Sequence, residues 1–216
     1  MSTFPRHLLE GYLTFTSQRL PTEQSRYREL SERGQSPEVM VIGCCDSRVS
    51  PEVIFDAGPG ELFVVRNVAN LVPVYQPDGG AHGVSAALEY AVRALHVKHI
   101  VVLGHAQCGG IRAFVDNIAP LSPGDFIGKW MSMFVKPGER VEQRDQETMQ
   151  EFTVRIEKAA VFRSLENLMT FPFVRTLVER DELYLHGAYF GVAEGSLSVL
   201  DPVAKEFRSV RESEAT

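Results

Sequence analysis

The feature that most restricts the fold is an alternation of short apolar runs with helical pattern. Runs at 39–42, 62–65 and 99–103 are rich in β-branched residues and bounded by Gly or polar residues, as buried parallel strands are. After the Gly-rich turn at 79–83, apolar residues recur at helical spacing: Val84, Leu88, Ala91, Val92 and Leu95. This βαβ order predicts an α/β fold with a central, mostly parallel sheet flanked by helices.

The second half of the chain extends this pattern. Residues 147–169 predict a long helix, and 183–189 and 196–200 predict two further strands. The inward face of the helix is expected from its apolar spacing: Met149, Phe152, Ile156, Ala159, Ala160 and Leu165. The stretch 120–145 is polar and punctuated by Pro and Gly, and its pattern identifies no element. We expect one domain over 1–216, with a core at 37–200 and a tail at 201–216.

Residues 1–36 predict an arm of two amphipathic helical pieces. One apolar face is formed by Leu8, Leu9, Tyr12, Leu13 and Phe15, and Pro21-Thr22-Glu23 is typical of a helix start. Such a segment has no core of its own. We therefore expect the arm to pack on a partner subunit.

Charge and cysteine content limit the partners and the compartment. The formal charge of -6 and the lack of a Lys/Arg-rich run argue against nucleic acid or an anionic membrane as partner, and favour small solutes. Three Cys, two of them adjacent, imply no disulfide framework and fit a reducing compartment. Because the sequence has no signal-peptide pattern and no membrane-spanning run, we expect a cytoplasmic protein.

Two short motifs follow predicted strands. Cys44-x-Asp46-x-Arg48 comes directly after the 39–43 run, and His105-x-x-Cys108 directly after 100–104. In open α/β sheets, ligands gather outside the carboxyl ends of the strands. Two thiolates and one imidazole suit a zinc ion, one per chain, and three protein ligands leave a position for water. The motifs therefore predict a hydrolytic or hydrating zinc site.

These residues allow other interpretations. Cys44 and Cys108 could be buried structural thiols, but both lie in loops beside Gly and polar residues. His105 could serve as a general base with a Cys nucleophile and no metal, and Cys44-Cys45 could be a redox couple. Neither explains Asp46 and Arg48. We expect Cys45 to be a small buried residue that points away from the metal.

Asp46 and Arg48 could form a surface ion pair of little consequence. Their position beside Cys44 predicts more. Asp46 could itself bind zinc and close the site, unless Arg48 holds its carboxylate by charge-assisted bonds. We expect the pair to keep Asp46 ionised as a hydrogen-bond acceptor.

With these motifs, the chain resembles the β-class carbonic anhydrases from about residue 35 to 195. Closely similar strings in that family match GELFVVRNVANLVP at 60–73, AALEYAV at 86–92 and NLMTFPFVR at 167–175. The resemblance implies reversible hydration of carbon dioxide to bicarbonate by a zinc-bound hydroxide. It also implies a homodimer or a higher even-numbered homo-oligomer.

Within that family the chain is most similar to the plant-like (type I) subgroup. That similarity implies a substrate pocket formed by Gln35, Phe63, Tyr90 and the backbone N–H of Gly109, with Val68 on its apolar wall and Gln35 reaching in from a neighbouring subunit. The other subgroup carries an inhibitory bicarbonate site with a Trp and a Tyr where this chain has Val41 and Phe190. Its third element, Arg66, is present here and is expected to be structural.

Two other functions remain open on the sequence alone. The same zinc hydroxide could hydrolyse carbon disulfide or carbonyl sulfide, which are also linear and apolar. The chain could also be a non-catalytic, zinc-stabilised binding module, which would require Asp46 as a fourth protein ligand.

Overall fold

The computed structural model describes residues 4–116, 126–135 and 141–213. Six strands form one sheet in the order β2-β1-β3-β4-β5-β6. The first four pair in parallel, and β5 and β6 are added antiparallel. The strands are β1 (Val39–Cys44), β2 (Leu62–Asn67), β3 (His99–His105), β4 (Tyr184–Gly191), β5 (Ser196–Asp201) and β6 (Glu206–Ser209). The predicted α/β fold with a mostly parallel sheet is confirmed.

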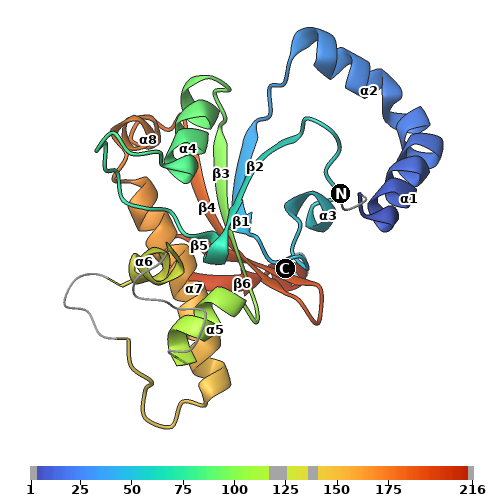
Figure 1. Cartoon of the computed structure of the whole chain (residues 1–216). Helices are drawn as coiled ribbons and strands as arrows, with labels where there is room; N and C mark the ends of the chain where they lie inside the picture. Colours follow the sequence, from blue (N-terminus) through green and yellow to red (C-terminus); the bar gives the residue numbers. More distant parts are fainter. Residues whose placement is uncertain (1–3, 117–125, 136–140, 214–216) are drawn as a thin grey trace.

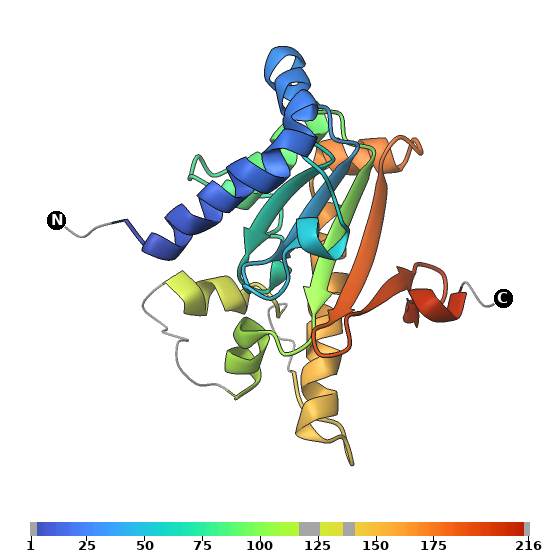
Figure 2. The ribbon, with the colours of Figure 1, turned by 90° about the vertical axis from the view of Figure 1, so that its right-hand side faces the viewer.

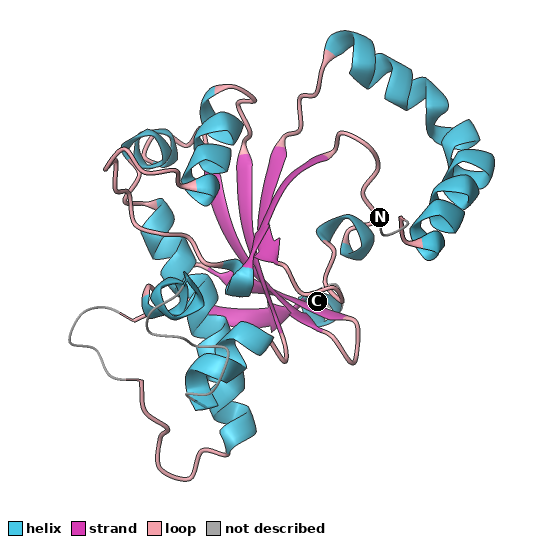
Figure 3. Ribbon diagram, in the orientation of Figure 1, coloured by secondary structure: helices cyan, strands magenta, loops and turns pink. Residues whose placement is uncertain are grey.

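Helices surround the sheet (Figures 1 and 3). In order along the chain they are α1 (Arg6–Thr14), η1 (Phe15–Arg19), α2 (Leu20–Arg33), α3 (Pro51–Ile54), η2 (Val68–Asn70), α4 (Gly83–Arg93), α5 (Gly109–Asp116), α6 (Phe126–Ser132), α7 (Met149–Leu168), α8 (Pro172–Val178) and α9 (Val210–Ser213). The largest core cluster lies between the sheet and α4, α7 and α8, and includes Met40, Ile100, Val161 and Phe171. The opposite face is covered near α3 by a smaller cluster around Val41 and Leu103.

Helix α7 packs on β3 and β4 beneath the carboxyl ends of the strands. Its start is fixed by a capping box, in which the hydroxyl of Thr148 accepts from the Glu151 N–H and the Glu151 carboxylate accepts from the Thr148 N–H. Met149 was expected to face inward, but it is the first residue of the helix and is 51% exposed. The deeper positions Phe152, Ile156 and Ala160 are buried as predicted.

The N-terminal arm extends away from the sheet (Figures 1 and 2). It comprises α1, the π-helical turn η1 and α2, and none of its described residues is buried. The arm meets the body of its own chain beside Gly60, where Leu30 closes over the glycine and the Arg26 Nε donates to the Pro59 carbonyl at 3.3 Å. Among the described residues, nothing covers the apolar face of the arm, where Phe4, Leu8, Leu9, Tyr12 and Leu13 are exposed.

The segment 201–216, expected as a tail, contributes β6, which pairs with β5. The Phe207 ring packs edge-on against Phe162 and Tyr189, which anchors this strand. In the segment 120–145, the structure describes α6. The rest of that segment lies partly outside the described residues.

Candidate metal centre

Cys44, His105 and Cys108 come together at the carboxyl ends of β1 and β3. Their ligand atoms all lie within 4.8 Å of one another, and all three residues are buried. The two sulfurs are 4.0 Å apart. Two Zn–S bonds of about 2.3 Å at a tetrahedral angle would separate them by about 3.8 Å. The spacing therefore fits one zinc ion.

The imidazole of His105 is oriented for metal binding. Its Nδ1 lies 2.9 Å from the Ala106 carbonyl, which makes Nδ1 the protonated nitrogen. Its Nε2 is buried and has no hydrogen-bond partner among the described residues. A buried nitrogen lone pair with no partner is costly in a metal-free protein. The donor set thus has the chemistry of a zinc site.

Backbone N–H groups surround the two sulfurs. The hydrogen bond with Cys108 lowers the pKa of Cys44, and the backbone N–H groups of Asp46 and Ala69 lower it further. The same thiol pair raises the pKa of Cys108, since the two sulfurs share a proton, while the N–H groups of Gly110 and Ile111 favour its thiolate. A divalent cation removes the competition between the two thiolates, because it neutralises both charges.

Asp46 and Arg48 lie beside the cluster and are paired. The Arg48 Nε donates to Asp46 Oδ1 at 2.9 Å, and Nη2 donates to Oδ2 at 2.7 Å. These bonds lower the pKa of Asp46 far below its ordinary range. No fourth His, Cys, Asp or Glu among the described residues joins the three-ligand group. A non-catalytic zinc-binding module would require Asp46 as a fourth ligand, and Asp46 does not belong to this group.

Arg66 holds the loop that carries these residues. Its Nε donates to the Cys44 carbonyl at 2.8 Å and its Nη2 to the Asp46 carbonyl at 2.7 Å. Cys45 follows the strand and is not part of the ligand group. It was expected to be buried, but it is exposed and lines a groove of about 1070 Å³. The prediction of burial was wrong because the chain leaves the sheet after Cys44.

The predicted substrate residues divide into two groups. Val68 packs in the same apolar cluster as Cys44 and Cys108, and Gly109 begins α5 next to Cys108 with open space around its Cα. Phe63 pairs with Met40, four positions before the Cys44–Asn67 pair, which is roughly 13 Å along the strand. Tyr90 lies against Phe63 with ring centroids 5.9 Å apart, and Gln35 precedes β1. Within one chain, Gln35, Phe63 and Tyr90 lie at the opposite end of the sheet from the metal ligands.

The sequence analysis missed one residue at this site. Glu157 on α7 is 2% exposed, and its Oε1 accepts from the backbone N–H of Cys108 at 2.9 Å. The sequence does carry a signal for this residue, because the acidic Glu157 interrupts the apolar face of α7 one turn before Val161.

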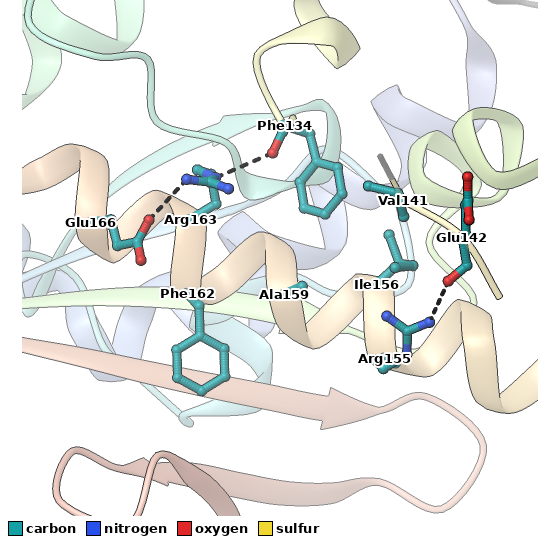
Figure 4. Close-up of a pocket in the computed structure, with 9 residues that line it drawn as sticks. All are labelled: Phe134, Val141, Glu142, Arg155, Ile156, Ala159, Phe162, Arg163 and Glu166. Atoms are coloured by element: carbon teal, nitrogen blue, oxygen red, sulfur yellow. Dashed lines mark hydrogen bonds and ion pairs between the residues drawn. The ribbon is translucent and has the colours of Figure 1, made fainter. Parts of the chain in front are cut away.

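The outer side of α7 borders a separate cavity of about 290 Å³ (Figure 4). Its arginines are engaged by the protein itself. The Arg163 Nε donates to the Phe134 carbonyl at 3.2 Å, and the Arg155 Nη2 donates to the Glu142 carbonyl at 3.0 Å. None of the predicted site residues lines this cavity, so it is not part of the metal centre.

Comparisons with known proteins agree with this geometry. The family model described as carbonic anhydrase matches residues 39–197. The Arabidopsis thaliana protein called beta carbonic anhydrase 3 is 36% identical over 193 residues, which cover 88% of this chain and 74% of that protein. The solved structure of the β-carbonic anhydrase CcaA superposes with a TM-score of 0.84 at 27% identity, covering 94% and 91% of the two chains. Tetrameric β-carbonic anhydrases from Sordaria macrospora give a TM-score of 0.76 at 30% identity, covering 90% and 95%.

Proposed function

The chain belongs to the β-class carbonic anhydrases and catalyses the zinc-dependent, reversible hydration of carbon dioxide, and we propose that Asp46, Arg48 and pocket residues from two subunits complete its site. The observation that carries this proposal is the buried Cys44–His105–Cys108 cluster beside a paired carboxylate that is not part of it. These three side chains would hold a zinc ion, which would supply a Lewis acid that activates water for attack on carbon dioxide.

Asp46 orients the attacking water. Both of its oxygens already accept from Arg48, yet a carboxylate has about four acceptor positions, so it can accept one more hydrogen bond. The side chain of Asp46 is only 16% exposed, which limits its exchange with bulk solvent. Arg48 is also anchored, since its Nη2 donates to the Gln107 carbonyl at 3.1 Å. The Asp46–Arg48 pair thus fixes the direction in which the O–H of the water points.

The substrate pocket needs a second subunit. Val68 provides an apolar wall suited to an uncharged gas, and the backbone N–H of Gly109, an exposed residue, donates to a substrate oxygen. Gln35, Phe63 and Tyr90 are too far along the sheet to reach the zinc ligands of their own chain. In a homodimer, or a higher even-numbered assembly, these three residues of one subunit complete the site of the other.

The arm supports the same assembly. Its apolar face has no cover from the part of the chain that the structure describes, and a second copy of the chain would cover it. The similarity to tetrameric β-carbonic anhydrases is consistent with such an arrangement. We propose that the arm, residues 1–36, packs on the partner.

We propose that the chain belongs to the plant-like subgroup. Val41 is 1% exposed in the core, and the guanidinium of Arg66 is occupied by two backbone carbonyls. These positions therefore offer no pocket for an inhibitory bicarbonate, and the site remains open without that regulation.

We propose a cytoplasmic location, because a zinc site with two thiolates is best maintained under reducing conditions. Among the described residues, no helix is long and apolar enough to cross a membrane.

The function is tested by stopped-flow hydration of carbon dioxide before and after removal of zinc with a chelator. Activity is expected to disappear with the metal and to return when zinc is restored. A parallel assay of carbonyl sulfide hydrolysis measures the preference between the two substrates. A protein that hydrates carbon dioxide equally well without metal, or not at all with it, would refute the proposal.

The two-subunit site is tested by mixing variants. Cys44→Ala removes a ligand from one chain, and Gln35→Ala removes the pocket residue from the other. A mixed dimer then contains one site with all its groups intact, so its activity is expected to exceed that of either homodimer. Activity no higher than the average of the two homodimers would contradict a shared site.

A further inference from the structure

A buried carboxylate lies directly behind the loop that joins two of the zinc ligands. This inference rests on the proposed function. We infer that Glu157, which is held by Tyr189, is a positioning residue that fixes the His105–Cys108 loop. Through this loop it positions both the metal ligand Cys108 and the Asp46–Arg48 pair.

Both oxygens of Glu157 are occupied. Oε1 accepts from the Cys108 N–H at 2.9 Å, and Oε2 accepts from the Tyr189 hydroxyl at 2.6 Å. Short bonds to a charged acceptor are the stronger kind and fix geometry well. The carboxylate therefore holds the peptide N–H of the ligand Cys108 and is itself held in place by Tyr189.

This loop has an unusual backbone that needs support. Gln107 has a φ of 57°, in the left-handed region that costs a residue with a side chain about 1 kcal/mol or more. The turn brings His105 and Cys108 to the same point. Without the acceptor on Glu157, the N–H of the buried Cys108 would lose its hydrogen-bond partner.

The opposite side of the same loop is held by Arg48. Its Nη2 donates to the Gln107 carbonyl at 3.1 Å while it also binds the Asp46 carboxylate. The turn is thus fixed by Glu157 at the Cys108 N–H and by Arg48 at the Gln107 carbonyl. A shift of this loop would move the Cys108 sulfur and the orienting carboxylate together.

A purely structural role would not call for a carboxylate. Burying a charged group is costly, and an apolar side chain of similar size at a core position of α7 is often as stable or more so. Glu157 is 2% exposed and Tyr189 is 8% exposed, so solvent does not compensate the charge. The hydrogen bonds to the ligand loop account for its presence.

The test is zinc affinity, measured by competition with a chromophoric chelator, in Glu157→Gln. The amide can accept from the Cys108 N–H, but its NH₂ group faces the Tyr189 hydroxyl and the charge is lost. We expect zinc to bind about 10-fold more weakly, as for other partners of metal ligands, with kcat reduced and KM little changed. In the cobalt-substituted protein, the sulfur-to-metal charge-transfer band is expected to shift.

Two further variants complete the design. Asn167→Ser removes a buried hydrogen bond from the same helix, to the Val72 carbonyl at 2.7 Å, without touching the ligand loop. It is expected to lower Tm and leave zinc affinity unchanged. Tyr189→Phe removes only the 2.6 Å bond to Glu157 and is expected to weaken zinc binding several-fold. If Glu157→Gln does not fold, the zinc affinity of Tyr189→Phe tests the inference in its place.

The inference is overturned if folded Glu157→Gln binds zinc within twofold of the wild type and differs from it only in Tm, as the control Asn167→Ser is expected to do. If Glu157→Gln does not fold, the same result for Tyr189→Phe overturns it. Wild-type protein that binds no zinc or hydrates no carbon dioxide would instead refute the proposed function. The two failures are therefore distinguishable.

Discussion

Arg48 holds Asp46 by both carboxylate oxygens, with Nε 2.9 Å from Oδ1 and Nη2 2.7 Å from Oδ2. The backbone N–H of Arg48 adds a third bond to Oδ1 at 3.0 Å. We expect a carboxylate fixed in this way to stay ionised and off the metal, where it can orient water. Its removal should then affect catalysis without affecting metal binding.

Asp46→Asn is expected to retain zinc and to lower kcat by about 100-fold, the loss typical of one positioned hydrogen-bonding group. The amide keeps the shape of the carboxylate but places an NH₂ group against a donor of Arg48. Metal analysis and stopped-flow hydration on the same preparation check this. Loss of zinc, or an unchanged kcat, would show that Asp46 has another role.

Cys44→Ala and His105→Ala are expected to lose zinc and hydration together, since two ligands do not hold the ion at a three-ligand site. Cys45→Ser is the matched control. Cys45 is adjacent in sequence but exposed, and it does not belong to the ligand group. If Cys45→Ser lost zinc as well, the assignment of ligands would be wrong.

Gly104→Ala tests the packing that places His105. A Cβ at this position would lie 2.6 Å from Val161 Cγ2 on α7. Because the valine is stiff and buried, the helix must shift, and we expect the free energy of unfolding to fall by about 1–3 kcal/mol in denaturant titrations.

Val161→Ala should relieve that clash. The double variant is therefore expected to lose less stability than the sum of the two single variants. Strict additivity would mean that the contact between Gly104 and Val161 does not limit the packing of α7 on β3.

Burial lowers the pKa of His186 below 6.5, and the nearby His99, whose Nδ1 lies 3.1 Å from His186 Nε2, adds to the effect. The unfolded chain then takes up the proton first, so this residue makes stability fall as pH drops below about 6.5. Between about pH 7.5 and 5.5, Tm of the wild type is expected to fall more than Tm of His186→Gln. Parallel Tm curves would contradict this.

The position of the metal centre could be predicted from sequence because it follows from local pattern. The runs at 39–42 and 99–103 predict parallel strands, and in such a sheet the residues after adjacent strands lie close together. Cys44 and His105 then meet, although they are far apart along the chain. The spacing from His105 to Cys108 adds the third ligand without any knowledge of the fold.

Other features depend on contacts that a single sequence does not encode locally. Strand β6 is only four residues long, and it is anchored by Phe207 packing on Phe162 and Tyr189. Glu157 lies in a helix whose polar residues are mostly at the surface, and its burial follows from the docking of α7 under the ligand loop. The separation of Phe63 from Cys44 depends on the strand register.

The proposed function depends on one zinc ion that is held by three protein ligands with a position left for water. Zinc X-ray absorption spectroscopy of the purified protein under alkaline conditions measures this coordination. We predict two sulfurs at about 2.3 Å, one imidazole nitrogen at about 2.0–2.1 Å and one exchangeable oxygen ligand. A metal-free protein, or a zinc ion with four protein ligands including the Asp46 carboxylate, would contradict the account.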